Sequence, residues 1–258
     1  MKKLLASLIL IFAALWSASA FAAAGAVQQQ PIQIAAAANL TKVFTEQIIP
    51  AFTKKTGIAV QPTFGATGLL ARQMESGAPY QVFVSADTST PALLSREKLL
   101  DPASVKTFVI GRLVLWSKSL PVKKEGFAVL TTDAVKDIAV ANPKTAPYGL
   151  ATIQTLNKLN LLSTVQPKIV YAENISQALQ FAQSGNAEVG FTALSLVQGT
   201  AAGNYYLIPE KLHEPIEQAE GVAPGAAQGA LQFAEFLISK DAQKIFASAG
   251  YMPPKSKK

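Results

Sequence analysis

Residues 32–44 have the sequence IQIAAAANLTKVF, which predicts a buried strand that runs directly into a helix. The apolar residues before Asn39 have the length of a strand. Apolar residues then recur every four positions along one helix face, at Leu40, Phe44, Ile48 and Phe52. Asn39 is a candidate N-cap, because an Asn side-chain oxygen accepts a hydrogen bond from the first helical turn. The free N–H groups of such a turn can also bind an anion, although a simple capped helix is the alternative for this stretch alone.

The same order of strand, turn and helix repeats in the residues that follow. A second strand begins at residues 58–60 and leads into a glycine-rich turn, residues 64–68, where Thr67 is a candidate cap and hydroxyl donor. The third strand, residues 80–84, ends at Ser85 and is followed by another helix. This βαβαβα series predicts a parallel, doubly wound sheet.

A long apolar strand over residues 108–116, with Gly111 inside it, is the expected crossing to a second domain. Strands and helices alternate again from residue 138, and residues 216–222 are the expected return crossing before two closing helices. We therefore predict an α/β protein of two lobes, each a mixed, mostly parallel sheet flanked by helices. The expected lobes are residues 30–112 plus 223–258 (lobe I) and residues 113–222 (lobe II). Small ligands prefer the cleft between such lobes.

The N-terminus has the features of a cleaved signal peptide over residues 1–24. Two lysines, Lys2 and Lys3, precede an apolar segment that is too short to cross a bilayer. Small residues predict cleavage between about Ala20 and Ala24. The junction has no cysteine, so we do not expect a lipid-anchored product. We expect an exported, periplasmic protein.

Composition excludes several functional classes. Half of the 258 residues are hydrophobic and 15% are charged, which is typical of a folded protein. Without cysteines there is neither a disulfide nor thiolate chemistry. Removing Lys2 and Lys3 lowers the formal charge from +7 to +5, and three further lysines lie at the C-terminal tail. No basic stripe with interleaved aromatic residues is present, so we expect no nucleic-acid partner.

Catalytic and metal-binding patterns are weak. The only histidine, His213, lies beside a turn and is expected at the surface, and no Gly-x-Ser-x-Gly elbow accompanies it. Asp87 and Glu173 follow strands, but capping and first-turn dipole roles at helix starts explain both more simply. Cation sites need clustered ligands that this sequence lacks. We expect neither an enzyme nor a resident cofactor or metal cation.

Helix starts that follow strands are the recurring feature, with two in each predicted lobe. They lie at Asn39, Thr67, Tyr148 and Ile175. Uncharged donors that converge from helix N-termini can bind a fully ionised oxyanion. A site without acceptors also rejects an oxyanion that retains a proton. The pattern favours a tetrahedral dianion.

Several ungapped blocks, in order along the mature chain, resemble the periplasmic molybdate-binding proteins of ABC importers. They are residues 36–41, 64–73, 77–79, 83–87, 142–149, 172–175 and 249–251. The resemblance implies a monomeric, two-lobed periplasmic-binding-protein fold that closes on molybdate or tungstate and delivers it to a membrane permease. Carried over by position, it implies ligand contacts at Ala38, Asn39, Thr67, Tyr148 and Ile175.

This sequence departs from many family members at three positions. Asn39 and Thr67 stand where many members have Ser, and Ala193 stands where many have a ligand-contacting Tyr. Whether the Asn39 side chain contacts the anion or only holds the turn stays open from the sequence. Three alternative functions also stay open: a receptor for another oxyanion such as sulfate, with phosphate weaker; a secreted hydrolase using His213 or Asp87; and an exported interaction module with a vestigial cleft.

Overall fold

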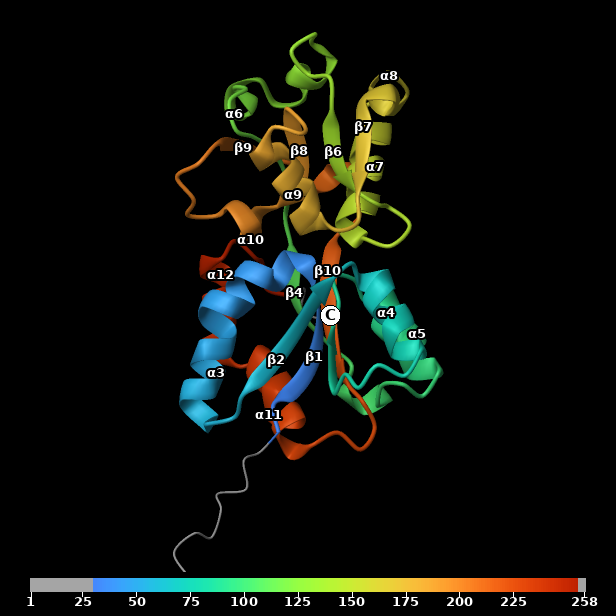
Figure 1. The fold of residues 1–258 in the computed structure, drawn as a ribbon, viewed down its shortest axis with the longest axis vertical. Coiled ribbons are helices and arrows are strands. Elements are labelled where there is room, and N and C mark those ends of the chain that lie inside the picture. Colours follow the sequence, from blue (N-terminus) through green and yellow to red (C-terminus); the bar gives the residue numbers. More distant parts are fainter. Residues whose placement is uncertain (1–29, 255–258) are drawn as a thin grey trace, which may run out of the picture. The chain divides into compact units, whose positions relative to one another are not determined.

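The computed structural model describes residues 30–254. The expected signal peptide and the C-terminal lysines lie outside these residues. No helix within residues 30–254 is long and apolar enough to span a membrane. The described chain forms two five-stranded sheets, drawn one above the other in Figure 1.

The first sheet has the strand order β2-β1-β3-β10-β4. β1 runs parallel to β2 and β3, whereas β10 runs antiparallel to β3 and β4. The strands are β1 (Ile32–Ala37), β2 (Val60–Gly65), β3 (Val82–Val84), β4 (Lys106–Gly111) and β10 (Ile216–Val222). The helical segments are α3 (Ile49–Thr56), α4 (Thr67–Glu75), α5 (Ser89–Arg96), η3 (Pro102–Ser104), α11 (Gln228–Leu237) and α12 (Lys240–Ser248). We call this half lobe I.

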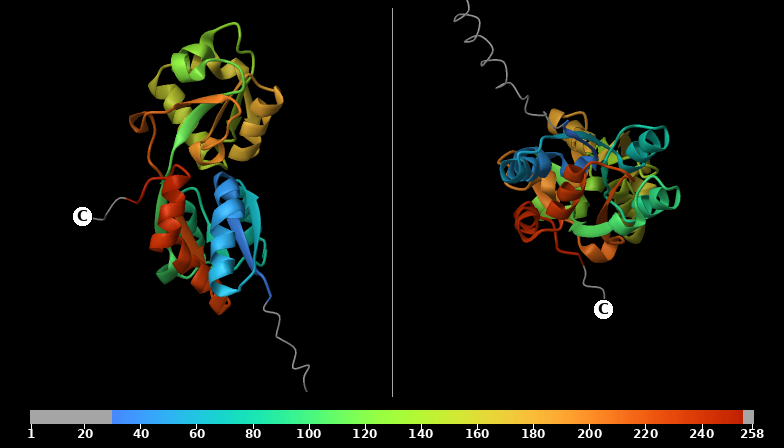
Figure 2. Two further views of the ribbon diagram at one scale, coloured as in Figure 1. Left: turned by 90° about the vertical axis from the view of Figure 1, so that its left-hand side faces the viewer. Right: turned by 90° about the horizontal axis from the view of Figure 1, so that it is seen from below.

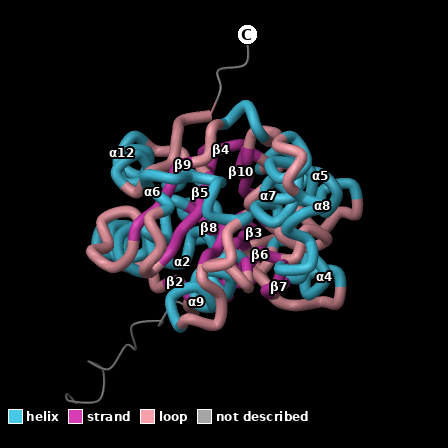
Figure 3. Tube along the Cα trace, turned by 90° about the horizontal axis from the view of Figure 1, so that it is seen from above, coloured by secondary structure: helices cyan, strands magenta, loops and turns pink. Residues whose placement is uncertain are grey.

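The second sheet has the order β7-β6-β8-β5-β9, and its half of the chain is lobe II. β6 is parallel to β7 and β8, and β5 is antiparallel to β8 and β9. The strands are β5 (Leu113–Ser117), β6 (Ile138–Ala141), β7 (Ile169–Ala172), β8 (Val189–Ala193) and β9 (Asn204–Leu207). The longer helices are α7 (Pro147–Lys158) and α9 (Ile175–Ser184). Shorter segments are α6 (Val122–Glu125), η4 (Gly126–Thr131), α8 (Leu162–Val165), η5 (Gln166–Lys168), α10 (Leu194–Val197) and η6 (Glu210–Leu212). Figure 3 shows helices around these strands.

The helix after β1 confirms the predicted apolar stripe. Helical residues run without a gap through η1 (Ala38–Leu40), α2 (Thr41–Val43), the π-turn η2 (Phe44–Ile48) and α3. All four stripe residues are fully buried. Pro50 has no N–H to donate to the preceding turn, and a π-turn immediately before it accommodates that loss.

The C-terminal helices return to lobe I, as predicted. The ring of Phe233 on α11 packs edge-on against Phe52 at 5.1 Å and against Phe44 at 6.0 Å between ring centroids. Figure 2 shows this C-terminal part beside the N-terminal helix. The first and last parts of the described chain therefore share one core.

Both predicted crossings need correction in detail. The apolar residues 108–116 form two strands, because β4 ends at Gly111 in the first sheet and β5 begins at Leu113 in the second. Residues 216–222 are not the return crossing and do not belong to lobe II. They form β10, which hydrogen-bonds to lobe I strands along both edges, so the chain returns between residues 207 and 216. Strand pairing, which no local pattern encodes, sets that boundary.

Candidate functional site

One pocket between the lobes is lined by all five residues that the family resemblance implied as ligand contacts. Ala38, Asn39 and Thr67 come from lobe I, and Tyr148 and Ile175 come from lobe II. The remaining lining residues are small or uncharged: Ala37, Gly65, Ala66, Ala86, Ala146, Pro147 and Asn174. Its cavity volume is about 10 Å³, room for the centre of about one water-sized sphere. The lining that the structure describes contains no charged side chain, so a ligand here meets dipoles instead of ions.

Four helical segments begin at this pocket, each directly or shortly after a strand. They are η1 after β1, α4 after β2, α7 after β6 and α9 after β7. The first N–H groups of a helix have no partner within it. Pro147 occupies the first position of α7 and has no N–H, so Tyr148 supplies the first donor of that helix. Within residues 30–254, the N–H groups of Asn39, Thr67, Tyr148 and Ile175 donate to no other protein group.

Thr67 adds a hydroxyl to these backbone donors. It is the first residue of α4, Ala66 is the N-cap, and the cap makes no side-chain hydrogen bond, so Thr67 does not cap the helix. Its buried Oγ1 accepts a hydrogen bond from the backbone N–H of Ala86 at 3.1 Å. A hydroxyl has one proton and two lone pairs, so the Thr67 proton is still free to be donated.

Asn39 is not the N-cap that the sequence predicted. It lies inside η1, whose N-cap is Ala37, and it is fully buried. Its Nδ2 donates to Gln218 Oε1 at 3.0 Å and to the Tyr251 hydroxyl at 2.9 Å, which uses both amide hydrogens. Its Oδ1 has no hydrogen-bond partner among residues 30–254. The side-chain nitrogen therefore holds the turn, and the backbone N–H is the donor of Asn39 that is left for a ligand.

Two long-range contacts hold the same turn from outside. The carbonyl oxygen of Asn39 accepts hydrogen bonds from Ser195 Oγ and from the Tyr251 hydroxyl, both at 2.9 Å. Burial raises the pKa of Tyr251, so this hydroxyl stays protonated at any physiological pH. Sequence reasoning missed Ser195, Gln218 and Tyr251 as supports of the site. The one sequence feature that could have identified Gln218 as a support of the site is a polar residue in the middle of a buried strand.

Tyr148 contributes its backbone to the pocket and its side chain to the interior. Its buried hydroxyl accepts a hydrogen bond from Gln218 Nε2 at 3.2 Å. Burial, and secondarily the nearby Tyr251, raise the pKa of Tyr148 well above its ordinary value. The start of α7 lies directly on the end of β6, since a Cβ at Gly149 would overlap the Ala141 carbonyl oxygen.

Asn174 caps α9. Its Oδ1 accepts from the N–H groups of Ser176 at 3.1 Å and Gln177 at 3.0 Å. This cap leaves the N–H of Ile175, the first residue of α9, unused.

The two lobes touch around the pocket, so the structure is a closed one. Five hydrogen bonds join residues of the two lobes around it: Gly68 N to Thr145 O at 2.9 Å, Ser176 Oγ to Ala38 O at 2.8 Å, Ser195 Oγ to Asn39 O at 2.9 Å, Lys42 Nζ to Gln198 O at 2.8 Å, and Gln218 Nε2 to the Tyr148 hydroxyl at 3.2 Å. Donors from both lobes reach one small volume only in this arrangement.

The other candidates lie elsewhere. His213 is 6% exposed, which corrects the predicted surface position. Its Nδ1 bonds the Glu214 carbonyl at 2.7 Å, and the residue lines a separate cavity of about 280 Å³. Asp87 holds the start of α5 by accepting from Thr90 N at 2.7 Å. Ala193 is buried at the end of β8 and does not line the interlobe pocket, and Glu173 does not line it either. Residues 30–254 contain no cluster of three potential metal ligands.

Two α/β lobes that are joined by two crossings and closed over a small pocket define a two-lobed solute receptor. Residues 32–252 match the family described as bacterial extracellular solute-binding protein, and the chain belongs to that family. It is 40% identical to the molybdate-binding protein ModA of Rhodobacter capsulatus over 84% of this chain and 86% of that protein. It is 39% identical to ModA of Azotobacter vinelandii over 88% of this chain and 91% of that protein.

A solved structure agrees with this assignment. The periplasmic molybdate-binding protein of Azotobacter vinelandii superposes with a TM-score of 0.82 at 36% identity, covering 87% of this chain and 100% of that one. The predicted fold class and the family resemblance are thereby confirmed.

Proposed function

We propose that this protein is a periplasmic receptor that captures molybdate in the interlobe pocket and releases it to an ABC permease. The observation that supports the proposal most directly is the pocket itself, where unused N–H groups from both lobes meet the Thr67 hydroxyl with no charged side chain present. The names of the relatives point to the same ligand.

The protonation state of the ligand follows from these donors. A fully ionised tetrahedral oxyanion accepts hydrogen bonds on every oxygen and suits converging N–H and O–H groups. An oxyanion that keeps a proton, such as monohydrogen phosphate, needs an acceptor. The Asn174 oxygen on the lining is already occupied by two N–H groups, and Asn39 Oδ1 is the side-chain amide oxygen of the lining that has no protein partner among residues 30–254. Ala38, Asn39, Thr67, Tyr148 and Ile175 are the residues that we assign to the ligand.

Tungstate has the charge and shape of molybdate, and we propose that it binds in the same way. Sulfate is the second candidate, because it is also a dianion at neutral pH and the same donors suit it. The proposed role is binding without catalysis: the two residues on which a hydrolase would depend, His213 and Asp87, both lie outside the pocket lining. Export by the predicted signal peptide and action as a monomer are parts of the same proposal.

Calorimetric titration of the mature protein with molybdate, tungstate, sulfate and phosphate tests the proposal. We expect tight binding of molybdate and tungstate, far weaker binding of sulfate, and the weakest binding of phosphate. Scattering with and without molybdate should show a smaller radius of gyration in the complex. Absence of heat with both molybdate and tungstate would overturn the proposed function, and preference for sulfate would select the second candidate.

A further inference from the structure

Gln218 connects the two halves of the pocket without lining it. It lies in the middle of β10 and is fully buried. Its Oε1 accepts from Asn39 Nδ2 at 3.0 Å, and its Nε2 donates to the Tyr148 hydroxyl at 3.2 Å. Asn39 belongs to lobe I and Tyr148 to lobe II, so one amide group joins two pocket residues that 109 positions of sequence separate.

The first crossing between the lobes provides the space for this contact. Gly111 is the last residue of β4, immediately before the chain passes to lobe II. A Cβ atom at this position would overlap the Tyr148 hydroxyl and come within 2.6 Å of Gln218 Nε2. The backbone of Gly111 does not have a positive φ angle, so its conformation does not require glycine. The Tyr148 phenol thus occupies room that exists because the crossing has no side chain there.

The two hydrogen bonds of the Gln218 side chain respond differently to opening of the lobes. The bond between Gln218 and Asn39 stays within lobe I and survives any movement of the lobes. The bond between Gln218 and Tyr148 crosses the lobes, and opening would separate the two groups. A buried amide that loses its partner is destabilised, and this loss would favour the closed state over the open one.

We propose that Gln218 is a positioning residue for the oxyanion site. Together with the space at Gly111, it fixes the Tyr148 end of α7 against the Asn39 turn and so stabilises the closed lobes, without touching the anion. The consequence for affinity rests on the proposed function, whereas the consequence for lobe closure does not.

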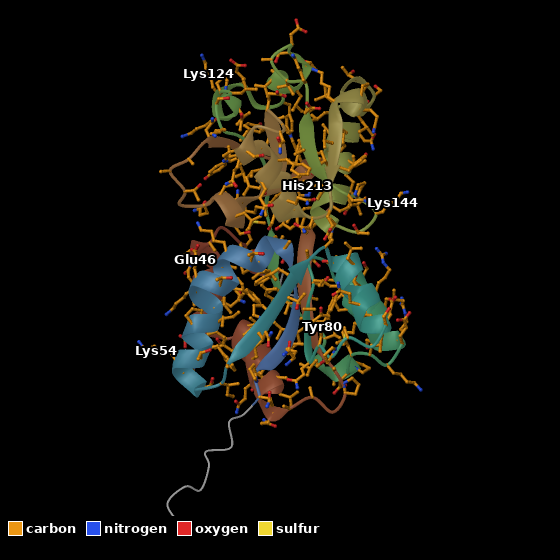
Figure 4. All side chains as sticks on the ribbon, viewed as in Figure 1. Glu46, Lys54, Tyr80, Lys124, Lys144 and His213 are labelled. Atoms are coloured by element: carbon orange, nitrogen blue, oxygen red, sulfur yellow. The ribbon has the colours of Figure 1, made fainter. Side chains whose placement is uncertain are left out.

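The absence of cysteine from the sequence makes lobe closure measurable with spin labels. Glu75, on α4 of lobe I, and Lys144, on the loop after β6 of lobe II, are exposed residues on either side of the contact between Gly68 and Thr145. Figure 4 shows Lys144 at the outer edge of its lobe. Labels at Glu75→Cys and Lys144→Cys report the interlobe distance by pulsed dipolar spectroscopy, with and without molybdate.

Gln218→Met is the main variant, because methionine keeps the length of the side chain and removes both polar atoms. We expect longer interlobe distances than in the unsubstituted labelled protein. We also expect molybdate affinity about tenfold lower, mostly through faster dissociation, since closure acts after encounter. Gly111→Ala should act in the same direction, because the new Cβ would take the space of the Tyr148 hydroxyl and of Gln218 Nε2.

Two matched controls separate this effect from general damage. Tyr80→Phe removes a hydroxyl that bonds only Gln73 at the surface, and Gly229→Ala adds a Cβ in α11 that would come within 3.3 Å of the Ile58 side chain. Both variants should keep the interlobe distances of the labelled parent protein and its molybdate affinity.

The outcomes are distinct. Distances for Gln218→Met that match the parent protein, free and with molybdate, would overturn the inference whether or not molybdate binds. Failure of the parent protein to bind molybdate would overturn the proposed function, and the distances of the free protein would still decide the role of Gln218.

Discussion

Ser176 Oγ donates a hydrogen bond to the carbonyl oxygen of Ala38 over 2.8 Å, from the second residue of α9 in lobe II to the first residue of η1 in lobe I. Ala38 lines the pocket, and so does Ile175, which precedes Ser176. The bond therefore brings one pocket-lining residue of each lobe close to the other. It exists only when the lobes are closed.

Removing this bond should weaken ligand binding. Ser176→Ala loses one interlobe hydrogen bond, so we expect molybdate affinity to fall by about twofold to tenfold. Calorimetric titration gives the change. Ser184→Ala is the matched control, because its hydroxyl bonds the Phe181 carbonyl within the same helix. Equal affinities for the two variants would contradict the role of the Ser176 bond in closure.

The Thr67 hydroxyl should be replaceable by serine and not by valine. Thr67→Val keeps the shape but removes both the free proton and the acceptor of the Ala86 N–H. We expect molybdate affinity to fall by an amount equivalent to about 1–3 kcal/mol. Thr67→Ser keeps the hydroxyl and should bind within about twofold of the parent protein. A valine variant that binds as well as the serine variant would exclude Thr67 as a donor.

Substitutions at Asn39 should separate support of the turn from electrostatics. Asn39→Ala leaves the buried polar groups of Gln218 and Tyr251 with fewer partners, so we expect the free energy of unfolding to fall by about 1–3 kcal/mol. Asn39→Asp adds a negative charge beside an anion pocket and should weaken molybdate binding further than alanine does. Denaturant unfolding and calorimetry measure the two effects. Binding to the aspartate variant as tight as to the alanine variant would argue against an anion at this place.

Stability should depend on pH through Glu220. This carboxyl is buried in β10, and burial raises its pKa from 4.5 to about 8, against a smaller lowering by Lys106. Since the folded state holds the proton more tightly than the unfolded state, the contribution of Glu220 to the unfolding free energy is highest below pH 4.5. It should fall as the pH rises towards 8 and then level off, by a total on the order of 5 kcal/mol.

The test for Glu220 is a neutral replacement. Glu220→Gln should lose this slope and be more stable than the parent protein at pH 8, as measured by denaturant unfolding between pH 4.5 and 8.5. Glu235→Gln, at an exposed position of α11, should keep the slope. The idea is falsified if the Glu220→Gln protein shows the same pH dependence as the parent.

His213 should be dispensable for the ligand. It lines a different cavity from the five proposed ligand residues, so His213→Ala should bind molybdate within about twofold of the parent protein. Its burial means that the substitution can still lower the unfolding temperature. Loss of molybdate binding in a variant that remains folded would revive a functional role for this histidine.

The local pattern of apolar residues carried most of the fold. The stripe from Leu40 to Phe52, the strand-to-helix order and the Asn174 cap depend on neighbours within a few positions, and the structure has them all. The π-turn ahead of Pro50 was not expected. Residues 216–222 were predicted as the return crossing, but their own sequence does not tell which sheet they join, because hydrogen bonds to distant strands decide that.

The features of the pocket can be separated in the same way, into those that local sequence determines and those that tertiary structure decides. By itself, the sequence determined that helix starts follow strands at Asn39, Thr67, Tyr148 and Ile175, because turn chemistry and helix periodicity are local. Only the tertiary structure decided what Asn39 does: its side chain is bonded to Gln218 and Tyr251, which lie 179 and 212 positions away. Those contacts exist because β10 and the C-terminus pack against η1, and packing over such separations has no signature in one sequence.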